Sequence, residues 1–323
     1  MPPTPTQPAE PTDPSSRRTD RIAVVVNTAS RTGARALPYV VAALQRAARQ
    51  VDVHPAHGGA GLAGALDDAL VSEPNLLVVG GGDGTIGAAA DRVAHTGTAL
   101  GVLPLGTAND FARTLQIPAS LDAAVDTVLR GPVVDVDLGR VDGRAYLNVA
   151  SLGLSVAVTR RLTPGLKRRL GRFAYPAATL AAYSRHRPFA ARIELSDGTV
   201  LELEDLMQVA VGNGRHYGGG LTVSPGASID DHLLDVYAVE QGRHRDHVSV
   251  ARLLRTGHLV DHDRVHHLTT RRLRLVTDEP MEVNLDGEIA ATTPATFEVD
   301  RNALHVVVPA DSRAARMDGR VSP

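Results

Sequence analysis

Short apolar runs alternate with amphipathic stretches through the first part of the chain. Ile22–Val26 has the β-branched composition of a strand, and leucine and valine then recur at helical spacing from Leu37 to Leu44. Three more units of the same kind follow, with predicted strands at Val51–His54, Leu76–Val79 and Ala99–Leu103. Strands that alternate with helices predict a doubly wound parallel sheet, covered on both faces, over residues 21–131.

The pattern changes after Gly131-Pro132, where hairpin signals separate the predicted strands. These signals are Asp142-Gly143, Ser196-Asp197-Gly198 and Asp300-Arg301-Asn302. Many short strands joined in this way predict a mainly antiparallel β-sandwich domain over residues 132–310. Two stretches with helical periodicity, Leu166–Tyr183 and His247–Val260, are expected to form helical insertions in it.

The two ends of the chain lack the apolar residues of a folded segment. Residues 1–20 are rich in proline, threonine and serine, so burial cannot offset the entropy that is lost on ordering. We expect a disordered tail there and a polar tail at residues 311–323.

Composition narrows the classes of function. With 34 basic and 36 acidic residues and 3% aromatic residues, the chain has neither the positive field nor the stacking surface that nucleic acids require. The absence of cysteine excludes disulfides, thiolate metal sites and a cysteine nucleophile, and it is typical of a cytoplasmic protein. No apolar run approaches the roughly 18 residues that span a bilayer, so membrane contact is expected to be peripheral, at the inner membrane face.

The segment Leu76–Ile86 carries the strongest chemical signal, because a strand runs through Gly80-Gly81-Gly82-Asp83-Gly84 into a helix. Glycines let the backbone approach an anion closely, and a helix N-terminus adds a favourable partial charge, so the loop is suited to phosphate. Asp83 would repel phosphate unless a cation lay between them, which favours a carboxylate associated with Mg²⁺. The alternative is a tight turn in which Asp83 caps the helix.

A second polar loop, Pro104–Arg113, follows the next predicted strand. Loops at the carboxyl ends of parallel strands share one edge of the sheet, so the two loops are expected to flank one crevice. Thr107 and Asn109 offer neutral hydrogen bonds, while Asp110 is suited either to holding water around a cation or to capping the helix.

Taken together, these loops resemble a known family. Gly-Gly-Asp-Gly-Thr at 81–85 and Pro-Leu-Gly-Thr-Ala-Asn-Asp-Phe-Ala at 104–112 are similar to the diacylglycerol kinase catalytic domain, which sphingosine and ceramide kinases share. The resemblance covers residues 21–309, and joint occurrence is more specific than any single glycine loop. The second half continues the pattern of bacterial soluble lipid kinases with Gly212-Asn213-Gly214, Gly218–Gly220, Pro225–Asp231, Leu234-Asp235-Val236 and Asn284–Glu288.

The resemblance implies an ATP-dependent kinase that uses Mg²⁺ and phosphorylates a lipid hydroxyl. Diacylglycerol is the default acceptor, with phosphatidylglycerol or a sphingoid base as alternatives. Glu288 corresponds to the proton acceptor, and Ser228, Asp231 and Leu233 fall where bacterial members bind a structural Mg²⁺. Nucleotide contacts are expected at Asn27, Gly81, Gly82, Asp83, Gly84, Thr85, Ile86, Gly87, Thr107, Asn109 and Asp110.

The chain departs from the family pattern at several positions. Asn27 is followed by Thr28 instead of proline, Gly87-Ala88 replaces the usual Asn-Glu, and His232 stands where glycine is common. These departures leave open a lipid or nucleotide sensor that keeps the fold. NAD and sugar-phosphate kinases use a similar glycine loop, but the later motifs favour a lipid kinase.

These residues suggest a mechanism in which the glycine loop binds the ATP phosphates and Asp83 positions Mg²⁺. Glu288, from the second domain, would accept the proton of the lipid hydroxyl once the cleft between the domains closes. Taken alone, Asp286-Gly287-Glu288 is also consistent with an ordinary hairpin turn.

Two further clusters of charged residues have open interpretations. The basic stretch Arg160–Arg172 and the apolar residues up to Tyr183 suit either an amphipathic helix on anionic lipid or a solvated helix face. Histidines at 244, 247, 258, 262, 266 and 267 are interpreted as scattered surface residues, since no cysteine accompanies them as in zinc sites. The sequence also leaves a homodimer open.

Overall fold

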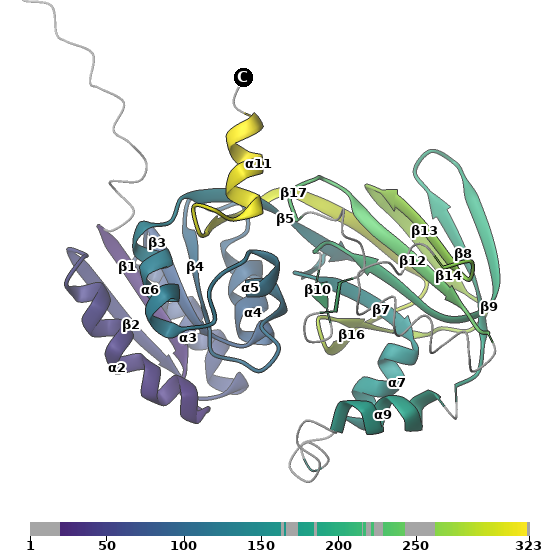
Figure 1. Ribbon diagram of the computed structural model, residues 1–323, viewed down its shortest axis with the longest axis horizontal. Helices are drawn as coiled ribbons and strands as arrows, with labels where there is room; N and C mark the ends of the chain where they lie inside the picture. The colour runs from purple at the N-terminus through teal and green to yellow at the C-terminus, as the bar shows by residue number, and fades with distance from the viewer. Residues whose placement is uncertain are drawn as a thin grey trace, which may run out of the picture.

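The computed structural model of the chain describes residues 20–162, 165, 174–183, 186–214, 216–217, 221–222, 229–242 and 262–321. The helical insertion predicted at His247–Val260 and nearly all of the predicted N-terminal tail lie outside these residues. Figure 1 shows two lobes side by side, with β5 and β17 running between them.

The first lobe confirms the predicted doubly wound domain. Its parallel strands lie in the order β2-β1-β3-β4, and β3 is buried along its whole length, as expected for a sheet with helices on both faces. α2 packs beside α6, and α3 packs beside α4. The strands are β1 (Arg21–Asn27), β2 (Gln50–Ala56), β3 (Leu76–Gly81) and β4 (Ala99–Pro104). The helices are α2 (Arg31–Gln45), α3 (Gly59–Val71), α4 (Asp83–Val93), α5 (Asp110–Thr114) and α6 (Leu121–Arg130).

The second lobe confirms the predicted antiparallel domain. Its strands follow the order β16-β15-β7-β9-β8-β14-β17, and β12 pairs with β9 and β13. Their inward-facing side chains, among them Leu206 and Phe297, form a separate apolar core. The strands are β5 (Val133–Val141), β6 (Arg144–Tyr146), β7 (Val149–Gly153), β8 (Phe189–Leu195), β9 (Val200–Gly212), β10 (His216–Tyr217), β11 (Leu221–Thr222), β12 (Leu234–Glu240), β13 (Val265–Thr270), β14 (Arg272–Thr277), β15 (Glu282–Leu285), β16 (Glu288–Thr292) and β17 (Ala295–Val307).

β5 and β17 form a long antiparallel ribbon that belongs to both lobes. Near its end, Val306 of β17 also pairs in parallel with Leu100 of β4, which adds β17 to the first sheet. The hairpin predicted at Asp300-Arg301-Asn302 is wrong, because these residues form an irregularity inside β17. The chain does not reverse there, since β17 pairs with β5 on both sides of the irregularity.

The first domain was predicted to end at residue 131, but residues beyond that position also belong to the core of the first lobe. Val134 and Val136 of β5 and Leu304 and Val306 of β17 are buried in it. The segment expected to be a polar tail instead forms α11 (Arg313–Val321), and Ala314 is buried in the same core. The helix has a polar composition, but Ala314 and Ala315 pack against this core and hold it in place.

Two helices lie below the second lobe in Figure 1. α7 (Leu154–Arg161) follows β7, and α9 (Ala174–Tyr183) packs against it and ends where the sequence predicts a helix end. Among the residues that the structure describes, no helix is long and apolar enough to cross a membrane.

Candidate active site

The carboxyl end of β3 leads directly into α4 through tightly packed glycines. A Cβ atom on Gly81 would lie 2.5 Å from the Cβ of Thr85, which excludes any larger residue without rearrangement. Gly82 is the N-cap of α4, and no side chain makes a capping hydrogen bond there. The first backbone N–H groups of the helix therefore lie at the end of a buried strand, an arrangement that favours binding of an anion.

The loop between β4 and α5 packs directly against this glycine loop, as predicted from the shared sheet edge. The Leu105 N–H donates to the Gly81 carbonyl at 2.9 Å, and a Cβ on Gly106 would lie 2.4 Å from the Gly82 Cα. Asn109 has a left-handed φ of 52°. Its Oδ1 accepts from the Gly106 N–H at 2.9 Å, so this amide holds the loop in shape.

Asp83 connects the two loops. Its Oδ1 accepts the backbone N–H of Phe111 at 3.1 Å. Phe111 is in the first turn of α5, so Asp83 caps the neighbouring helix, whereas the N-cap of its own helix is Gly82. Asp110, the first residue of α5, is itself buried. The polar residues of both loops are thereby fixed relative to one another.

The hairpin between β15 and β16 brings Glu288 to the glycine loop. Asp286 and Gly287 form its turn, with left-handed φ angles of 48° and 104°, as two-residue hairpin loops require. Glu288 is the first residue of β16, and its Oε1 lies 3.4 Å from the position that a Cβ on Gly84 would take. The structure therefore places an exposed carboxylate of the second lobe beside Gly84 of the first.

Asp286 anchors this hairpin, a role that the sequence analysis missed. Its carboxylate accepts three backbone N–H groups, from Leu147 at 2.5 Å and from Asn148 and Val149 at 3.0 Å each. Burial raises the pKa of Asp286 to about 6; the three N–H donors oppose that shift, and the negative charge of Asp83 adds to it. The Asp-Gly signal was visible in the sequence, but it explains only the turn and not the contacts of the side chain.

The Gly212-Asn213-Gly214 motif holds the backbone next to the Glu288 hairpin. Asn213 is buried, and its Nδ2 donates to the carbonyls of Asp137 and Leu147 at 3.0 Å each. Since Leu147 also donates to Asp286, Asn213 helps to fix the backbone on which the Glu288 hairpin rests. The motif therefore has a structural role at the edge of the site.

Of the remaining predicted nucleotide positions, Asn27 and Thr107 lie along the same sheet edge, whereas the side chain of Ile86 is buried in the core of the first lobe. Asn27 ends β1, and its Oδ1 accepts the Ala29 N–H at 3.2 Å, while Thr107 is exposed in the β4–α5 loop. A Cβ on Gly33 would lie 2.0 Å from the Asn27 carbonyl oxygen, so the turn after β1 is tight although the usual proline after Asn27 is absent. A cavity of about 500 Å³ opens beside these loops and is lined by Arg31, Thr32, Arg35, Ala36, Pro104, Leu105, Ala119 and Leu121.

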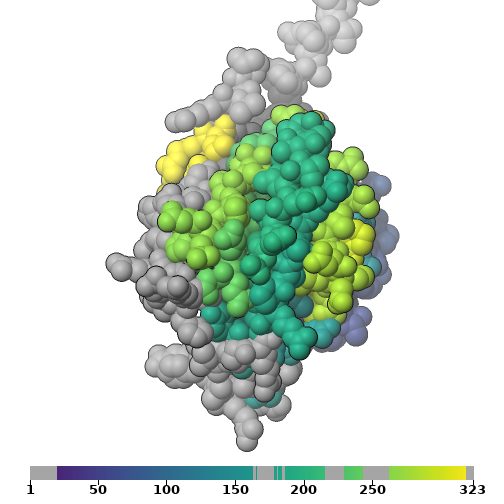
Figure 2. Space-filling view, turned by 90° about the vertical axis from the view of Figure 1, so that its right-hand side faces the viewer, coloured from purple at the N-terminus to yellow at the C-terminus, as the bar shows by residue number. Residues whose placement is uncertain are grey.

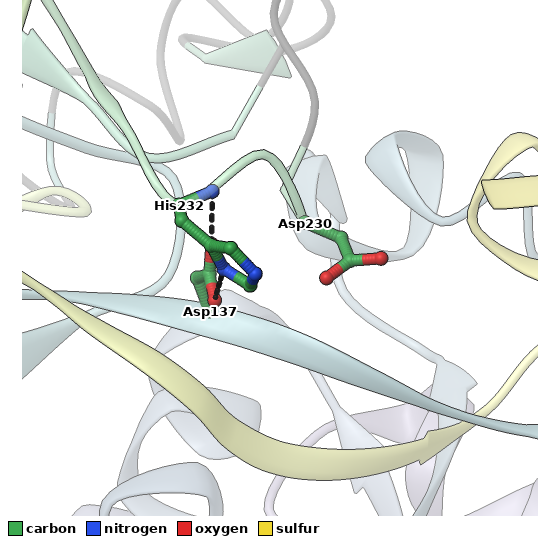
Figure 3. Close-up of side chains that lie close together, drawn as sticks. All are labelled: Asp137, Asp230 and His232. Carbon is green, nitrogen blue, oxygen red and sulfur yellow. Dashed lines mark hydrogen bonds and ion pairs between the residues drawn. The ribbon is translucent and has the colours of Figure 1, made fainter. Parts of the chain in front are cut away.

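The residues expected to hold a structural Mg²⁺ are only partly visible. Ser228 lies outside the described residues, and the Oδ1 of Asp231 accepts the Leu233 N–H at 3.1 Å. Close by, Asp137, Asp230 and His232 each place one ligand-type atom within 4.8 Å of the others (Figure 3).

Two of the scattered histidines have acidic neighbours on β12. His266 contacts Glu240 and His267 contacts Asp235, each at 2.8 Å. The histidines at 244, 247 and 258 lie outside the described residues. For His266 and His267, the structure therefore shows paired side chains at the surface of the sheet.

Two family models match consecutive parts of the chain. The diacylglycerol kinase catalytic domain model matches residues 21–141, and the YegS C-terminal NAD kinase beta sandwich-like domain model matches residues 148–308. A "Probable lipid kinase YegS-like" from Pseudomonas syringae pv. syringae is 35% identical over 76% of this chain and 80% of its own length. A "Diacylglycerol kinase" from Bacillus subtilis is 29% identical over 87% of this chain and 93% of its own length.

The fold has a counterpart among solved structures. The crystal structure of a diacylglycerol kinase from Bacillus anthracis str. Sterne superposes with a TM-score of 0.69 at 22% identity, covering 90% of this chain and 97% of that chain. The family model and the two relatives define the class as a lipid kinase. The chain belongs to the diacylglycerol kinase-like lipid kinase family, and the resemblance inferred from its motifs is confirmed.

Proposed function

We propose that the protein transfers the γ-phosphate of ATP to a hydroxyl group of a lipid, with diacylglycerol as its acceptor. One observation carries this proposal: Glu288 Oε1 lies 3.4 Å from the Cβ position of Gly84, at the N-terminus of α4. A proton acceptor and a phosphate-binding loop are the two parts that phosphoryl transfer requires of a protein.

The sheet edge offers several groups that suit a nucleoside triphosphate. The glycines at 81, 82 and 84 let the backbone approach the phosphates, and the α4 N-terminus favours their negative charge. Arg31 and Arg35 line the neighbouring cavity and can contact further phosphate oxygens through their guanidinium groups. Asn27 and Thr107 border the same edge.

The carboxylates of the site fit Mg²⁺. Asp83 lies close enough to Asp286 for its charge to raise the pKa of Asp286, so the site concentrates negative charge next to the place proposed for the phosphates. Hard carboxylate oxygens are the ligands that Mg²⁺ prefers, and we assign Asp83 to hold it. When bound, Mg²⁺ neutralises charge on the transferring phosphoryl group.

Glu288 would act on the acceptor. As the lipid oxygen forms its bond to the γ-phosphorus, the bond to the β-phosphate oxygen breaks and ADP leaves. The hydroxyl proton passes to the Glu288 carboxylate, whose place is fixed by the Asp286 anchor.

The test is transfer of labelled phosphate from ATP, with Mg²⁺, to diacylglycerol in mixed micelles. Glu288→Gln should lower turnover at least about a hundredfold, because it removes the proton acceptor. Asp83→Asn should do the same while retaining the oxygen that accepts the Phe111 N–H, so thermal stability is kept. Glu298→Gln serves as the control, since Glu298 makes only an exposed 3.9 Å ion pair with Arg272.

Parallel assays separate the remaining alternatives. Transfer to phosphatidylglycerol or a sphingoid base, with none to diacylglycerol, would change the acceptor and keep the enzyme class. Binding of ATP without transfer to any of the three lipids would support the sensor and reject the proposal. Wild-type rates in both Glu288→Gln and Asp83→Asn would reject the site.

A further inference from the structure

Asp137 is a buried carboxylate at the junction of the two lobes. It lies on β5 and is 1% exposed. Its oxygens accept the backbone N–H of His232 at 2.8 Å and that of Asn302, in the irregular part of β17, at 2.9 Å. Figure 3 shows the third contact, from the His232 ring: Nδ1 lies 3.0 Å and 3.2 Å from the two carboxylate oxygens.

The backbone of Asp137 strengthens the same junction. Its N–H donates to the Ile229 carbonyl at 2.8 Å, and Ile229 is buried in the core of the first lobe. Its carbonyl accepts from Asn213, which also supports the base of the Glu288 hairpin. One residue thus joins the turn at 229–232, the irregularity of β17 and the floor of the proposed active site.

The Asp137 carboxylate determines which nitrogen of the His232 ring carries a proton. An ionised carboxylate only accepts hydrogen bonds, so the Nδ1 of His232 must carry the proton and donate it. Two backbone N–H groups and one ring N–H then satisfy a carboxylate that is removed from water. Leaving such a group short of a partner strongly destabilises the fold.

The residues present do not fit the structural Mg²⁺ that the resemblance implies. The Oδ1 of Asp231, the expected carboxylate ligand, is turned onto the Leu233 N–H. His232 stands where glycine is common in the family. It has a left-handed φ of 60°, and its ring Nδ1 contacts Asp137. A glycine there would supply no ring, and the third partner of Asp137 would have to be a cation or water.

We propose that His232 replaces the structural cation in this chain, so that its ring N–H, and not a metal ion, completes the partners of Asp137 and holds the junction of the lobes. The ring of His232 also lies near Asp230, and the three side chains offer ligand-type atoms within 4.8 Å. Because Nδ1 contacts Asp137 directly, that ring nitrogen is not a metal ligand in this arrangement. The proposal concerns folding and is independent of phosphate transfer.

The test is thermal unfolding without nucleotide or lipid, in excess EDTA or in excess Mg²⁺. The wild-type protein should unfold at the same temperature in both. His232→Gly should unfold at least about 5 °C lower in EDTA, because Asp137 loses a partner, and Mg²⁺ should restore part of the loss. Glycine accepts the left-handed φ without strain, so the loss reports the ring. His305→Ala is the control: His305 contacts Asp135 at 2.6 Å in a more exposed pair, and neither effect is expected.

Three results would overturn the proposal. A wild-type unfolding temperature that falls in EDTA would show that a cation is bound. An increase on adding Mn²⁺ or Zn²⁺ to the wild type, absent in His232→Gly, would show that the three side chains hold a transition metal. A His232→Gly variant with wild-type stability and no response to Mg²⁺ would show that the ring is dispensable. A failed kinase assay would leave all three readouts unchanged.

Discussion

At the scale of single residues, Asp286 shows how a buried charge is used to hold a functional group in place. Its three backbone hydrogen bonds connect the Glu288 hairpin to Leu147, Asn148 and Val149. The bonds favour the ionised form, but burial and the charge of Asp83 outweigh them, and the pKa of Asp286 is about 6. The anchor therefore titrates between acidic and neutral pH.

This titration predicts a pH-dependent contribution to stability. The pKa of Asp286 is raised from 3.8 to about 6 on folding, so the folded state binds the proton more tightly than the unfolded state does. The resulting contribution to the free energy of unfolding has its full value below about pH 4. It is lost as the pH rises through about 6. Asp286→Asn removes the titration. We expect the free energy of unfolding of the wild type, minus that of Asp286→Asn, to fall as the pH rises from about 4 to about 7.

Urea denaturation at a series of pH values measures this difference. A constant offset between the two proteins is expected in addition, because an amide cannot replace a carboxylate that accepts three N–H groups. Only the change of this difference with pH tests the assigned pKa. A difference that stays flat across the whole range would contradict the assigned pKa.

At the scale of elements, the turn from β3 into α4 contains two glycines, Gly81 and Gly84, that differ in how much space a side chain would have. A Cβ on Gly81 would clash with Thr85 at 2.5 Å, whereas the nearest atom to a Cβ on Gly84 is Glu288 Oε1 at 3.4 Å, an ordinary contact. One glycine is therefore required by packing within the turn. The other keeps the space between the loop and the carboxylate open.

This contrast gives a paired prediction. Gly81→Ala should lower the free energy of unfolding by about 1–3 kcal/mol, because the packed turn must shift. Gly84→Ala should keep the stability, since Gly84 lies in α4 and alanine favours a helix by about 1 kcal/mol. Its turnover should nevertheless fall, because a methyl group enters the space between the loop and Glu288.

Chemical denaturation and the micelle assay measure the two effects separately. Gly59→Ala is the matched control, as it also lies in a helix and a Cβ there would meet no atom within 4 Å. Wild-type turnover in Gly84→Ala would argue that Glu288 does not act at this loop.

At the scale of the whole molecule, the β5–β17 ribbon decides how the lobes meet. Both strands contribute to both cores: Val134 and Val306 belong to the first, and Val141 and Phe297 to the second. Figure 2 shows the second lobe end-on, where strands from distant parts of the sequence lie side by side on its outer face. A ribbon shared by both cores connects the two lobes, and we expect any movement of one lobe toward the other to bend it at the irregularity in β17.

Membrane approach is a prediction at this scale. In α7, Arg160 is paired with Glu282, and Arg161 donates to the Ala157 carbonyl at 3.1 Å. The sequence following α7 supplies further cations, Lys167-Arg168-Arg169, which lie outside the described residues. Replacing these three by glutamine should weaken binding to phosphatidylglycerol vesicles roughly a hundredfold at low salt, because each basic residue near an anionic surface contributes about 1 kcal/mol.

Vesicle sedimentation measures this binding, with neutral phosphatidylcholine vesicles for comparison. The control carries glutamine at Arg272 and Arg274, which are exposed on β14. Equal binding by both variants and the wild type would place the membrane contact elsewhere on the molecule.

Local patterns were sufficient for much of the fold. β-branched runs and helical spacing predicted the parallel sheet, and Asp142-Gly143 predicted the β5–β6 turn, because period and turn chemistry are properties of neighbouring residues. The same rules failed at Asp300-Arg301-Asn302, where turn-type residues form an irregularity in a continuous strand. They also failed at residues 313–321, where contact with a distant core orders a polar helix.

The sequence by itself determined the strand–helix alternation, the glycine loop with its acidic residue, and the family, since each depends on residues close together in the chain. Only the tertiary structure decided that Glu288 faces Gly84, that Asp83 caps the helix of the other loop, and that Asp286 and Asp137 anchor segments far away in the sequence. A carboxylate has no fixed partner in a linear chain. Burial beside particular N–H groups assigns its role, and that burial exists only after distant parts of the chain have packed together.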